Sequence, residues 1–491
     1  MHVTVGTSTA TAMATPTPAP DTGEPQLSVR FTTQLEHLSV TDAPIQLPTR
    51  LSRAGLSEVV NHLLATLDSS HVPRPFDFLL NNELVRGPLG EALARHGLSG
   101  EAVATLEYVE CLPPPRPERS CAHEDWVGGL AAHPSGGNLA LAACYNHAVY
   151  VWDAHGHRLA ELAGHTAAVK AVTWLRGASQ QEGQQVLRAA SASKDHTVRT
   201  WRMVVKPSAE APTVEAACEA SLTGHASSVE SIASNPKGDM LCSGAWDGSI
   251  HLWSTPPIDG AEANGASTRA SKRAKVKADM PAPTAAPPAE LSPVASLSGH
   301  QGSVNALCWP TATLAYSGSW DGTLREWQVR ARRPLVPTWT ARSRAVALTR
   351  VQSCAQIETE SATATLAGQP AILDIDVSLM ASLIASAHTD HTLRVWDSRL
   401  QQAALRLKLT HPGWVSGVRW CPHQSHLLAS TCYDGRVRLW DVRSSIPLHE
   451  IKSHEGGKAL CVDWDGPERI LSGGSDAALR MATIALPGGA S

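Results

Sequence analysis

The chain has 491 residues, enough for two or three domains with a sizeable buried core. Its formal net charge of −4 at pH 7 excludes an overall basic field that would point to nucleic acid as the main partner. Its longest apolar runs fall short of the roughly 18 residues that a membrane-spanning helix needs, so we expect no membrane contact. Ten cysteines occur without a C-x-x-C pair, which favours a reducing compartment.

The aromatic residues divide the chain into two differently built parts. The three phenylalanines are Phe31, Phe76 and Phe78, whereas all fifteen tryptophans lie from Trp126 onward. Residues 1–25 are rich in Thr, Ala and Pro and lack Lys and Arg, which predicts a disordered tail and not a signal peptide. The proline-rich run at 111–121 predicts a linker between two domains.

Residues 26–110 alternate strand and helix signals. The runs QLSVRFTT and APIQLPTRL have period-two apolar positions, and 56–67 has the apolar stripe of an amphipathic helix. A short hairpin (FDFLLNNELV), a second helix at 87–98 and a closing strand (ATLEYVE) follow. This order resembles an α/β ubiquitin-like fold. No diglycine end follows the last strand, so we expect a docking module and not a conjugated tag.

A motif recurs through residues 122–486. Six segments share an Asp, or once an Asn, followed six residues later by Trp: YNHAVYVWD (145–153), KDHTVRTWR (194–202), WDGSIHLWS (246–254), WDGTLREWQ (320–328), TDHTLRVWD (389–397) and YDGRVRLWD (433–441). A weaker seventh unit carries His454, Ser472 and Asp476, with Ala482 in place of Trp. This WD-repeat pattern predicts an all-β propeller of seven four-stranded blades.

The repeats also contain the residue types of a hydrolase triad. By resemblance to other WD repeats, the His, Ser, Asp and Trp of a unit are expected to form a buried, hydrogen-bonded structural set. Two such sets are His225, Ser243, Asp247 and Trp253, and then His300, Ser317, Asp321 and Trp327. A catalytic constellation occurs once, whereas this one recurs in unit after unit, so the sequence predicts no enzyme.

The spacing between Trp253 and Trp327 indicates an insertion. Most of it is 255–294, rich in Ala, Pro and Ser, which predicts a disordered surface loop. The loop contains RASKRAKVK, whose basic residues are Arg269, Lys272, Arg273, Lys275 and Lys277. Two interpretations stay open: a nuclear-import or RNA-contact segment, or a solubilising run of charge.

Several stretches together resemble a known family. RLSRAGLSEVVNHLL, RPFDFLLNNELVRGPL, HGLSGEAVATLEYVE and the junction HEDWV are similar to the ribosome-biogenesis WD-repeat proteins of the PeBoW complex. The basic insertion between the third and fourth units fits the same family. The related notchless proteins share the domain order but lack the HEDWV-like junction and usually have eight blades, so a notchless-like midasin-binding factor is an alternative.

The resemblance implies a function and a set of partners. It implies a non-enzymatic assembly factor of the large (60S) ribosomal subunit and of pre-rRNA processing, located in the nucleolus and nucleoplasm. The implied partners are a propeller-bearing, block-of-proliferation-type protein, pescadillo, the pre-60S particle with possible rRNA contact, and the AAA ATPase midasin, which releases the complex. A substrate adaptor in ubiquitin signalling is an alternative from another functional class.

One acidic residue carries the implied contact with midasin. The resemblance assigns Glu101, in HGLSGEA, as the ligand that the ubiquitin-like domain offers in trans to a Mg²⁺ ion held by midasin. A hard cation accepts a carboxylate oxygen at roughly 2.0–2.1 Å. The chain itself is expected to bring no cofactor and no metal of its own. Without the resemblance, a single acid in this loop is a solvent-exposed carboxylate.

Overall fold

The computed structural model describes most of the chain in two compact units, Met1–Cys111 and Leu112–Ser491. The described residues are 26–68, 70–97, 103–134, 139–181, 184–206, 213–255, 288–329, 352–358, 370–397, 399 and 404–485.

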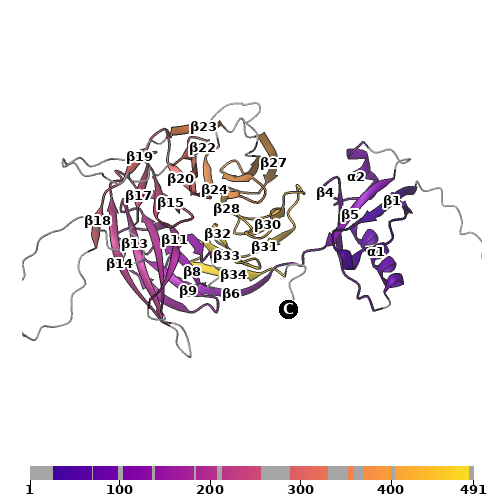
Figure 1. The fold of residues 1–491 in the computed structure, drawn as a ribbon, viewed down its shortest axis with the longest axis horizontal. Helices are drawn as coiled ribbons and strands as arrows, with labels where there is room; N and C mark the ends of the chain where they lie inside the picture. The colour runs from indigo at the N-terminus through magenta and orange to yellow at the C-terminus, as the bar shows by residue number, and fades with distance from the viewer. Residues whose placement is uncertain are drawn as a thin grey trace, which may run out of the picture. The chain divides into compact units, whose positions relative to one another are not determined.

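The first unit is a five-stranded mixed sheet with two helices. Its elements are β1 (Gln26–Thr32), η1 (Glu36–Leu38), β2 (Ile45–Pro48), α1 (Arg53–Leu67), β3 (Phe76–Leu80), β4 (Glu83–Leu84), α2 (Leu89–Arg95) and β5 (Ala104–Glu110). The strand order in the sheet is β2-β1-β5-β3-β4, with β1 and β5 parallel. The succession of strands and helices is the predicted one (Figure 1).

The core of this unit explains its three phenylalanines. Phe31, Phe76 and Phe78 are buried around Tyr108, with edge-on ring contacts of 5.5 Å from Phe76 and 6.2 Å from Phe31 to Tyr108. Helix α1 buries its Leu56, Val60 and Leu64 stripe, as its periodicity predicts. Helix α2 ends at Arg95, earlier than the predicted residue 98, because Gly97 takes a left-handed conformation (φ 65°) that stops the helix.

The described part of the second unit consists of seven sheets. The first sheet contains β7 (Val127–Ala132), β8 (Leu139–Cys144), β9 (Val149–Asp153) and β10 (Arg158–Leu162); the second contains β11 (Val169–Gln181), β12 (Gln184–Ser193), β13 (Thr197–Lys206), β14 (Thr213–Thr223) and β18 (Ala289–Leu291); the third contains β15 (Val229–Ser234), β16 (Met240–Ala245), β17 (Ile250–Ser254) and β19 (Ala295–Leu297). The fourth contains β20 (Val304–Cys308), β21 (Leu314–Ser319), β22 (Thr323–Gln328) and β23 (Gln352–Glu358), and the fifth contains β24 (Ile372–Ser378), β25 (Leu383–His388), β26 (Thr392–Asp397) and β27 (Ala404–Thr410). The sixth contains β28 (Val415–Trp420), β29 (Leu427–Cys432), β30 (Val437–Asp441) and β31 (His449–Ile451), and the seventh contains β32 (Ala459–Asp465), β33 (Arg469–Gly474), β34 (Ala478–Thr483) and β6 (Arg116–Ala122).

The seven sheets form a closed ring. The first strands contact one another in the order β7, β11, β15, β20, β24, β28 and β32, and β32 contacts β7 (Figure 1). Each sheet buries apolar side chains against its neighbours; Val415 and Val418 of one sheet, for example, pack with Leu393 and Val395 of the preceding one. A single sheet has two apolar faces to bury, so the ring stabilises sheets that could not fold alone.

The predicted linker at 111–121 is wrong in its second half. Strand β6 begins at Arg116 and pairs antiparallel with β34, so the start of the second unit completes the sheet formed by its end. The reason is the open edge of β34, whose backbone donors and acceptors need a partner strand. The run of prolines obscured this strand, and Pro117 is tolerated because it lies where the register shifts.

The predicted insertion 255–294 is also too long. Residues 289–291 form β18, which pairs in parallel with β14, where Leu291 lies opposite Leu222. Leu291 packs beside the buried cluster that includes Leu222 and Trp253. Leu291 thus covers apolar surface at the edge of the sheet that contains β14.

Two observations bear on compartment and membrane. The nine cysteines for which the structure describes the side chain are free thiols, and Cys144, Cys242 and Cys432 are fully buried or nearly so. In the described ranges, none of the helices is long and apolar enough to cross a membrane.

Candidate functional site

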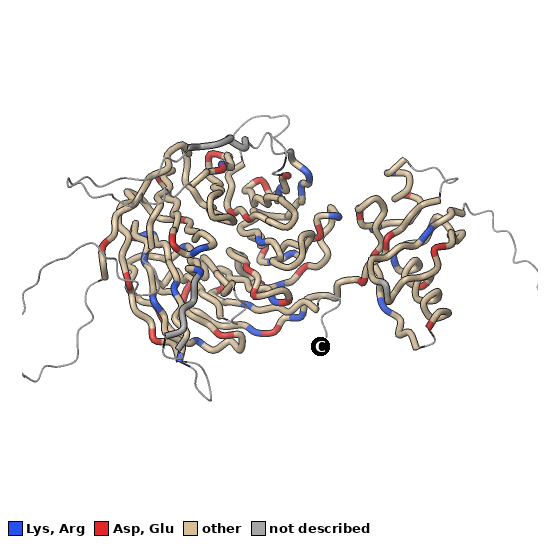
Figure 2. The backbone as a smooth tube through the Cα atoms, viewed as in Figure 1, with Lys and Arg blue, Asp and Glu red and all other residues tan. Residues whose placement is uncertain are grey.

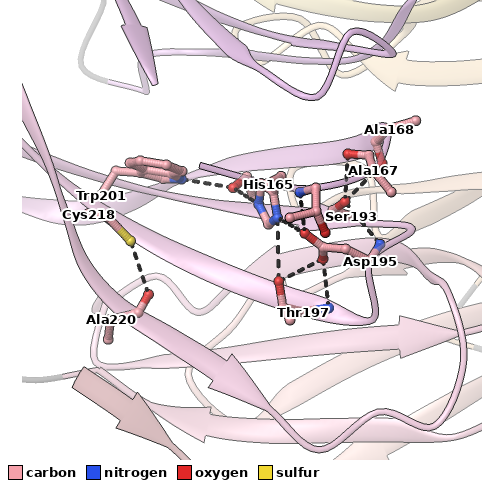
Figure 3. A network of polar contacts seen from close by, with 11 residues as sticks. His165, Ala167, Ala168, Ser193, Asp195, Thr197, Trp201, Cys218 and Ala220 are labelled. Atoms are coloured by element: carbon pink, nitrogen blue, oxygen red, sulfur yellow. Dashed lines mark hydrogen bonds and ion pairs between the residues drawn. The ribbon is translucent and has the colours of Figure 1, made fainter. Parts of the chain in front are cut away.

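The second sheet shows what a complete set of repeat residues does. The ring nitrogen Nε2 of His165 lies 2.8 Å from the hydroxyl of Ser191, and Trp201 Nε1 donates to the same hydroxyl at 2.8 Å. Figure 3 shows His165 between Trp201 and Asp195. The Asp195 carboxylate can only accept, so the Nδ1 of His165, 2.7 Å away, carries a proton and donates to it (Figure 3). With its proton on Nδ1, the ring can accept from the Ser191 hydroxyl at Nε2.

The predicted set His300, Ser317, Asp321 and Trp327 has the same geometry. His300 Nε2 lies 2.7 Å from Ser317 Oγ, Trp327 Nε1 donates to Ser317 at 2.8 Å, and His300 Nδ1 lies 2.9 Å from Asp321 Oδ2. Burial disfavours the charged form of Asp321, but hydrogen bonds from His300 and Thr323 outweigh it and hold the pKa of this carboxyl well below its usual range. The carboxylate is therefore ionised and bonded on several sides.

The predicted set around Ser243 differs in one member. His225 and Trp253 bond Ser243 at 2.7 and 2.8 Å. Asp247 does not reach the histidine: His225 Nδ1 lies 3.3 Å from Ser249 Oγ, and Asp247 accepts the Ser249 backbone N–H at 2.8 Å. Burial, and second the ring of His251 stacked at 4.1 Å, lower the pKa of His225 to about 3.

These sets hold the sheets together and leave no reactive group. Ser243 and Ser317 have no exposed surface, and each hydroxyl is shared between an indole donor and an imidazole acceptor. In the fourth sheet the set joins the turn before β20, where His300 lies, to β21 and β22, which carry Ser317 and Trp327. A hydroxyl that is buried and fully bonded cannot attack a substrate, so the geometry supports the structural interpretation of the repeat.

Sequence reasoning missed two kinds of residue that take part in the sets. In the fifth sheet, His388, two residues beyond Ser386 on the same strand, bonds its hydroxyl at 2.9 Å. Arginines four residues after the repeat Asp bond that carboxylate in three sheets, from Arg394 to Asp390, Arg438 to Asp434 and Arg480 to Asp476, at 2.6–2.9 Å. Each arginine follows its Asp by four residues, and this constant spacing is a sequence signal from which the contact could have been predicted.

The first sheet lacks the central hydroxyl. Ala142 occupies the position that Ser holds in the other units, and the buried Nε1 of Trp152 and Nε2 of His123 have no hydrogen-bond partner. Burial, and then the charge of Arg158, lower the pKa of His123 to about 4. In the seventh sheet His454 bonds Asp476 at 2.7 Å and Ser472 at 3.0 Å, while the Trp position is Ala482.

The remaining predicted site residues lie outside the described residues. Glu101 falls between α2 and β5, and Arg269, Lys272, Arg273, Lys275 and Lys277 fall between β17 and β18. Among the residues that are described, no group of three or more His, Cys, Asp or Glu side chains could hold a metal ion.

Family models match both units. The model described as the NLE (NUC135) domain matches residues 27–93, and the model of the WD domain, G-beta repeat, matches 116–153, 156–202, 216–254, 291–328, 361–397 and 405–441. The chain is therefore a WD-repeat protein with an N-terminal NLE domain.

Whole-chain relatives narrow the family. The chain is 34% identical over 462 residues to a protein of Oryza sativa subsp. japonica named "Ribosome biogenesis protein WDR12 homolog", covering 93% of this chain and 96% of the relative. Proteins of the same name from Drosophila pseudoobscura pseudoobscura and Chlamydomonas reinhardtii are each 32% identical, covering 94% and 93% of this chain and 96% and 98% of the relative. The chain belongs to this family of WDR12-type ribosome biogenesis proteins.

Proposed function

We propose that this protein is a non-enzymatic assembly factor of the large ribosomal subunit, acting in pre-rRNA processing as a scaffold of the PeBoW complex. The observation that carries the proposal is similarity along 93% of the chain to proteins named for ribosome biogenesis, which includes both the NLE domain and the repeats. The proposed partners are the propeller-bearing PeBoW protein, pescadillo, midasin and the pre-60S particle.

The architecture supports a scaffold built of two docking parts. We assign the ring of seven sheets as a seven-bladed propeller and the first unit as a ubiquitin-like domain. Support comes from the closed contacts of the first strands and from the sheet order β2-β1-β5-β3-β4 with parallel central strands. The buried, fully bonded serines argue against hydrolase chemistry at the repeats.

The proposed release step depends on Glu101. Its carboxylate would complete the coordination of a Mg²⁺ ion held by midasin, since Mg²⁺ prefers carboxylate oxygens in an octahedral shell. Support comes from the family match of the NLE domain to residues 27–93, next to HGLSGEA in the sequence. The ion belongs to the partner, so this chain contributes one ligand and no metal site.

A binding experiment tests the release step. Full-length protein and the Glu101→Ala and Glu101→Asp variants are incubated with the adhesion-site domain of midasin in magnesium-containing buffer. Both variants are expected to lose binding, because alanine has no ligand and aspartate is one methylene shorter. Wild type is expected to lose binding in a chelator. The matched control is Glu58→Ala, an exposed carboxylate on α1, which should bind normally. Equal binding by wild type and Glu101→Ala would contradict the metal bridge.

The proposed location is the nucleolus and nucleoplasm, with import directed by the basic segment. Replacing Arg269, Lys272, Arg273, Lys275 and Lys277 by alanine in a fluorescent fusion should shift the protein to the cytoplasm. A nucleolar signal in both proteins would leave the segment to RNA contact or solubility. A cytoplasmic signal for the wild type would contradict the proposed function as a whole.

A further inference from the structure

The seventh sheet has an alanine at the position where the other six sheets have a buried tryptophan. Ala482 stands ten residues after Ser472, as Trp440 stands ten residues after Ser430 in the sixth sheet. None of the six repeat tryptophans is more than 7% exposed: Trp152, Trp201, Trp253, Trp327, Trp396 and Trp440. The seventh sheet therefore lacks a large side chain that the other sheets bury.

The place of the missing indole follows from the sixth sheet. Trp440 packs on the fifth sheet, against Leu393 and Leu409, which pair with each other there. The equivalent pair in the sixth sheet is Val437 and Ile451, because Val437 also stands three residues before the Trp of its own strand. An indole at position 482 would therefore lie on Val437 and Ile451, which belong to the same apolar cluster as position 482.

A groove lies between the sixth and seventh sheets at this place. It has a volume of about 490 Å³, and its lining includes Val437, Ile451, Ser472 and Ala482. Pro117 of β6, the register partner of Ala482, lines it as well. A pocket of roughly 300–1,000 Å³ with apolar walls and few polar groups is typical of a ligand site. The neighbouring side chains thus leave open the space that an indole takes in the other sheets.

The hydroxyl of Ser472 lacks the donor that the other repeat serines have. His454 Nδ1 donates to Asp476 at 2.7 Å, so its Nε2, 3.0 Å from Ser472 Oγ, accepts from the serine hydroxyl. None of the described residues donates to the Ser472 oxygen, whereas Trp440 Nε1 donates to Ser430 Oγ at 2.8 Å. Ser472 is 2% exposed and lines the groove. A buried oxygen without a donor favours a ligand that carries an N–H.

The charged residues of the groove favour an acidic group beside the ligand. Glu118, Glu450 and Arg480 line the groove, and each forms an ion pair within the chain. Arg119 and Lys452 also line it and are exposed, and among the described residues neither has a carboxylate within ion-pair distance. Basic and acidic residues are interspersed through the second unit (Figure 2). Two basic groups complement one or two carboxylates, whereas an RNA strand needs a longer run of positive charge.

We propose that the groove between the sixth and seventh sheets binds a tryptophan side chain of a partner protein, flanked by an acidic residue. The indole lies on Val437 and Ile451 and donates its N–H to the Ser472 oxygen, and the acidic neighbour lies beside Arg119 and Lys452. In five sheets of the same ring, an indole at the equivalent position donates to the repeat serine at 2.8 Å, and this recurrence identifies the occupant.

Binding of defined peptides to the full-length protein tests the proposal. The probe is the amidated, acetylated peptide Gly-Asp-Trp-Asp-Gly, followed by ligand-observed NMR, and its expected Kd is on the order of 0.1–1 mM. Ser472→Ala should weaken binding about fivefold to tenfold, because the indole N–H loses its acceptor. The peptide Gly-Lys-Trp-Lys-Gly should bind about tenfold more weakly than the probe, with a smaller difference at high salt.

Ala482→Trp fills the groove from within the chain. This variant should no longer bind the probe, and the midpoint of its thermal unfolding should rise, because the new indole buries apolar surface and donates to Ser472. A lower midpoint would show that the groove has no room for an indole and would overturn the proposal. The matched control is Ser120→Ala, which removes an exposed hydroxyl from the lining of the same groove and should bind like wild type.

The remaining outcomes decide the site and its occupant. Absence of probe binding by wild type, or equal binding by wild type and Ala482→Trp, would contradict the site. If free indole binds and neither peptide does, the occupant is a small aromatic molecule and not a partner side chain. Displacement of the probe by a single-stranded oligoribonucleotide would overturn the protein assignment in favour of RNA. These measurements use neither midasin nor a PeBoW partner, so this site and the proposed function can fail separately.

Discussion

The first and fourth sheets of the ring share one architecture, but the first has Ala142 and Asn146 where the fourth has Ser317 and Asp321. In the fourth sheet, Ser317 joins His300 and Trp327 with bonds of 2.7 and 2.8 Å. In the first sheet, Ala142 leaves the buried nitrogens of His123 and Trp152 without a partner, although the strands pair in the same way. The polar set therefore stabilises a sheet whose shape is specified by its apolar side chains and by ring closure.

The difference between these two sheets also separates the cost of an unpaired buried polar group from the gain of a satisfied hydrogen bond. A buried donor without an acceptor costs about 1–3 kcal/mol, whereas the net gain from a satisfied hydrogen bond is about 1 kcal/mol. The first sheet tolerates the unpaired Trp152 donor and the unpaired His123 ring nitrogen because contacts with both neighbouring sheets bury its apolar residues, including Leu141 and Val149. The following changes test this comparison, from the largest expected effect to the smallest.

Removing the hydroxyl of the complete set should have the largest effect. Ser317→Ala leaves Trp327 Nε1 and His300 Nε2 buried without partners, so it should lower the free energy of unfolding by about 2–4 kcal/mol. Urea unfolding followed by tryptophan fluorescence measures it, since all fifteen tryptophans lie in the second unit. A loss below about 0.5 kcal/mol would show that the set contributes nothing to stability.

The repeat aspartates should differ in how much they contribute to the free energy of unfolding. Asp321→Asn removes a charged acceptor bonded directly to His300 at 2.9 Å and should cost about 2 kcal/mol. Asp247→Asn should cost under about 1 kcal/mol, because Asp247 bonds the Ser249 backbone and not His225. Equal losses in the same unfolding experiment would mean that the direct contact is irrelevant.

The His225 set should make stability depend on pH. The pKa of His225 in the folded protein is about 3, below the ordinary value of 6.5, so the folded state keeps the ring neutral where the unfolded chain protonates it. This contribution is present above pH 6.5 and is lost as the pH falls toward 3. From pH 7.5 to 5.5, wild type should lose about 1.4 kcal/mol more than His225→Asn, which cannot titrate. Parallel losses in both proteins would rule out His225 as a source of acid sensitivity.

Adding the missing hydroxyl should have the smallest effect. Ala142→Ser places an acceptor and a donor between Trp152 and His123 and should raise the free energy of unfolding by about 1 kcal/mol. Ala143→Ser, one residue along β8 and pointing to the other face of the sheet, is the control and should destabilise. Destabilisation by Ala142→Ser would mean that the first sheet has no room for the set.

Much of the repeat unit was readable from the sequence because it is local. The resemblance to other WD repeats implied that His, Ser, Asp and Trp of a unit form one hydrogen-bonded set, and the side chains around Ser317 do so. The same expectation fails for Asp247, because Ser249 and His251 contact the ring of His225. The sequence also did not predict the role of His388. In the other units the histidine comes from the turn before the first strand, and only the structure shows that a histidine on the same strand as Ser386 takes its place.

The sequence by itself determined the alternation of elements in the first unit and the recurring strands of the second, since hydrophobic period and turn residues are properties of neighbouring positions. Only the tertiary structure decided that Arg116–Ala122 closes the ring beside Ala478–Thr483 and that Leu291 covers the edge at Leu222. The tertiary structure also places Trp246, Trp320 and Lys194 on the lining of the same hollow. The physical reason is that an open strand edge and a buried apolar face are satisfied by whatever segment reaches them, however distant that segment is along the chain.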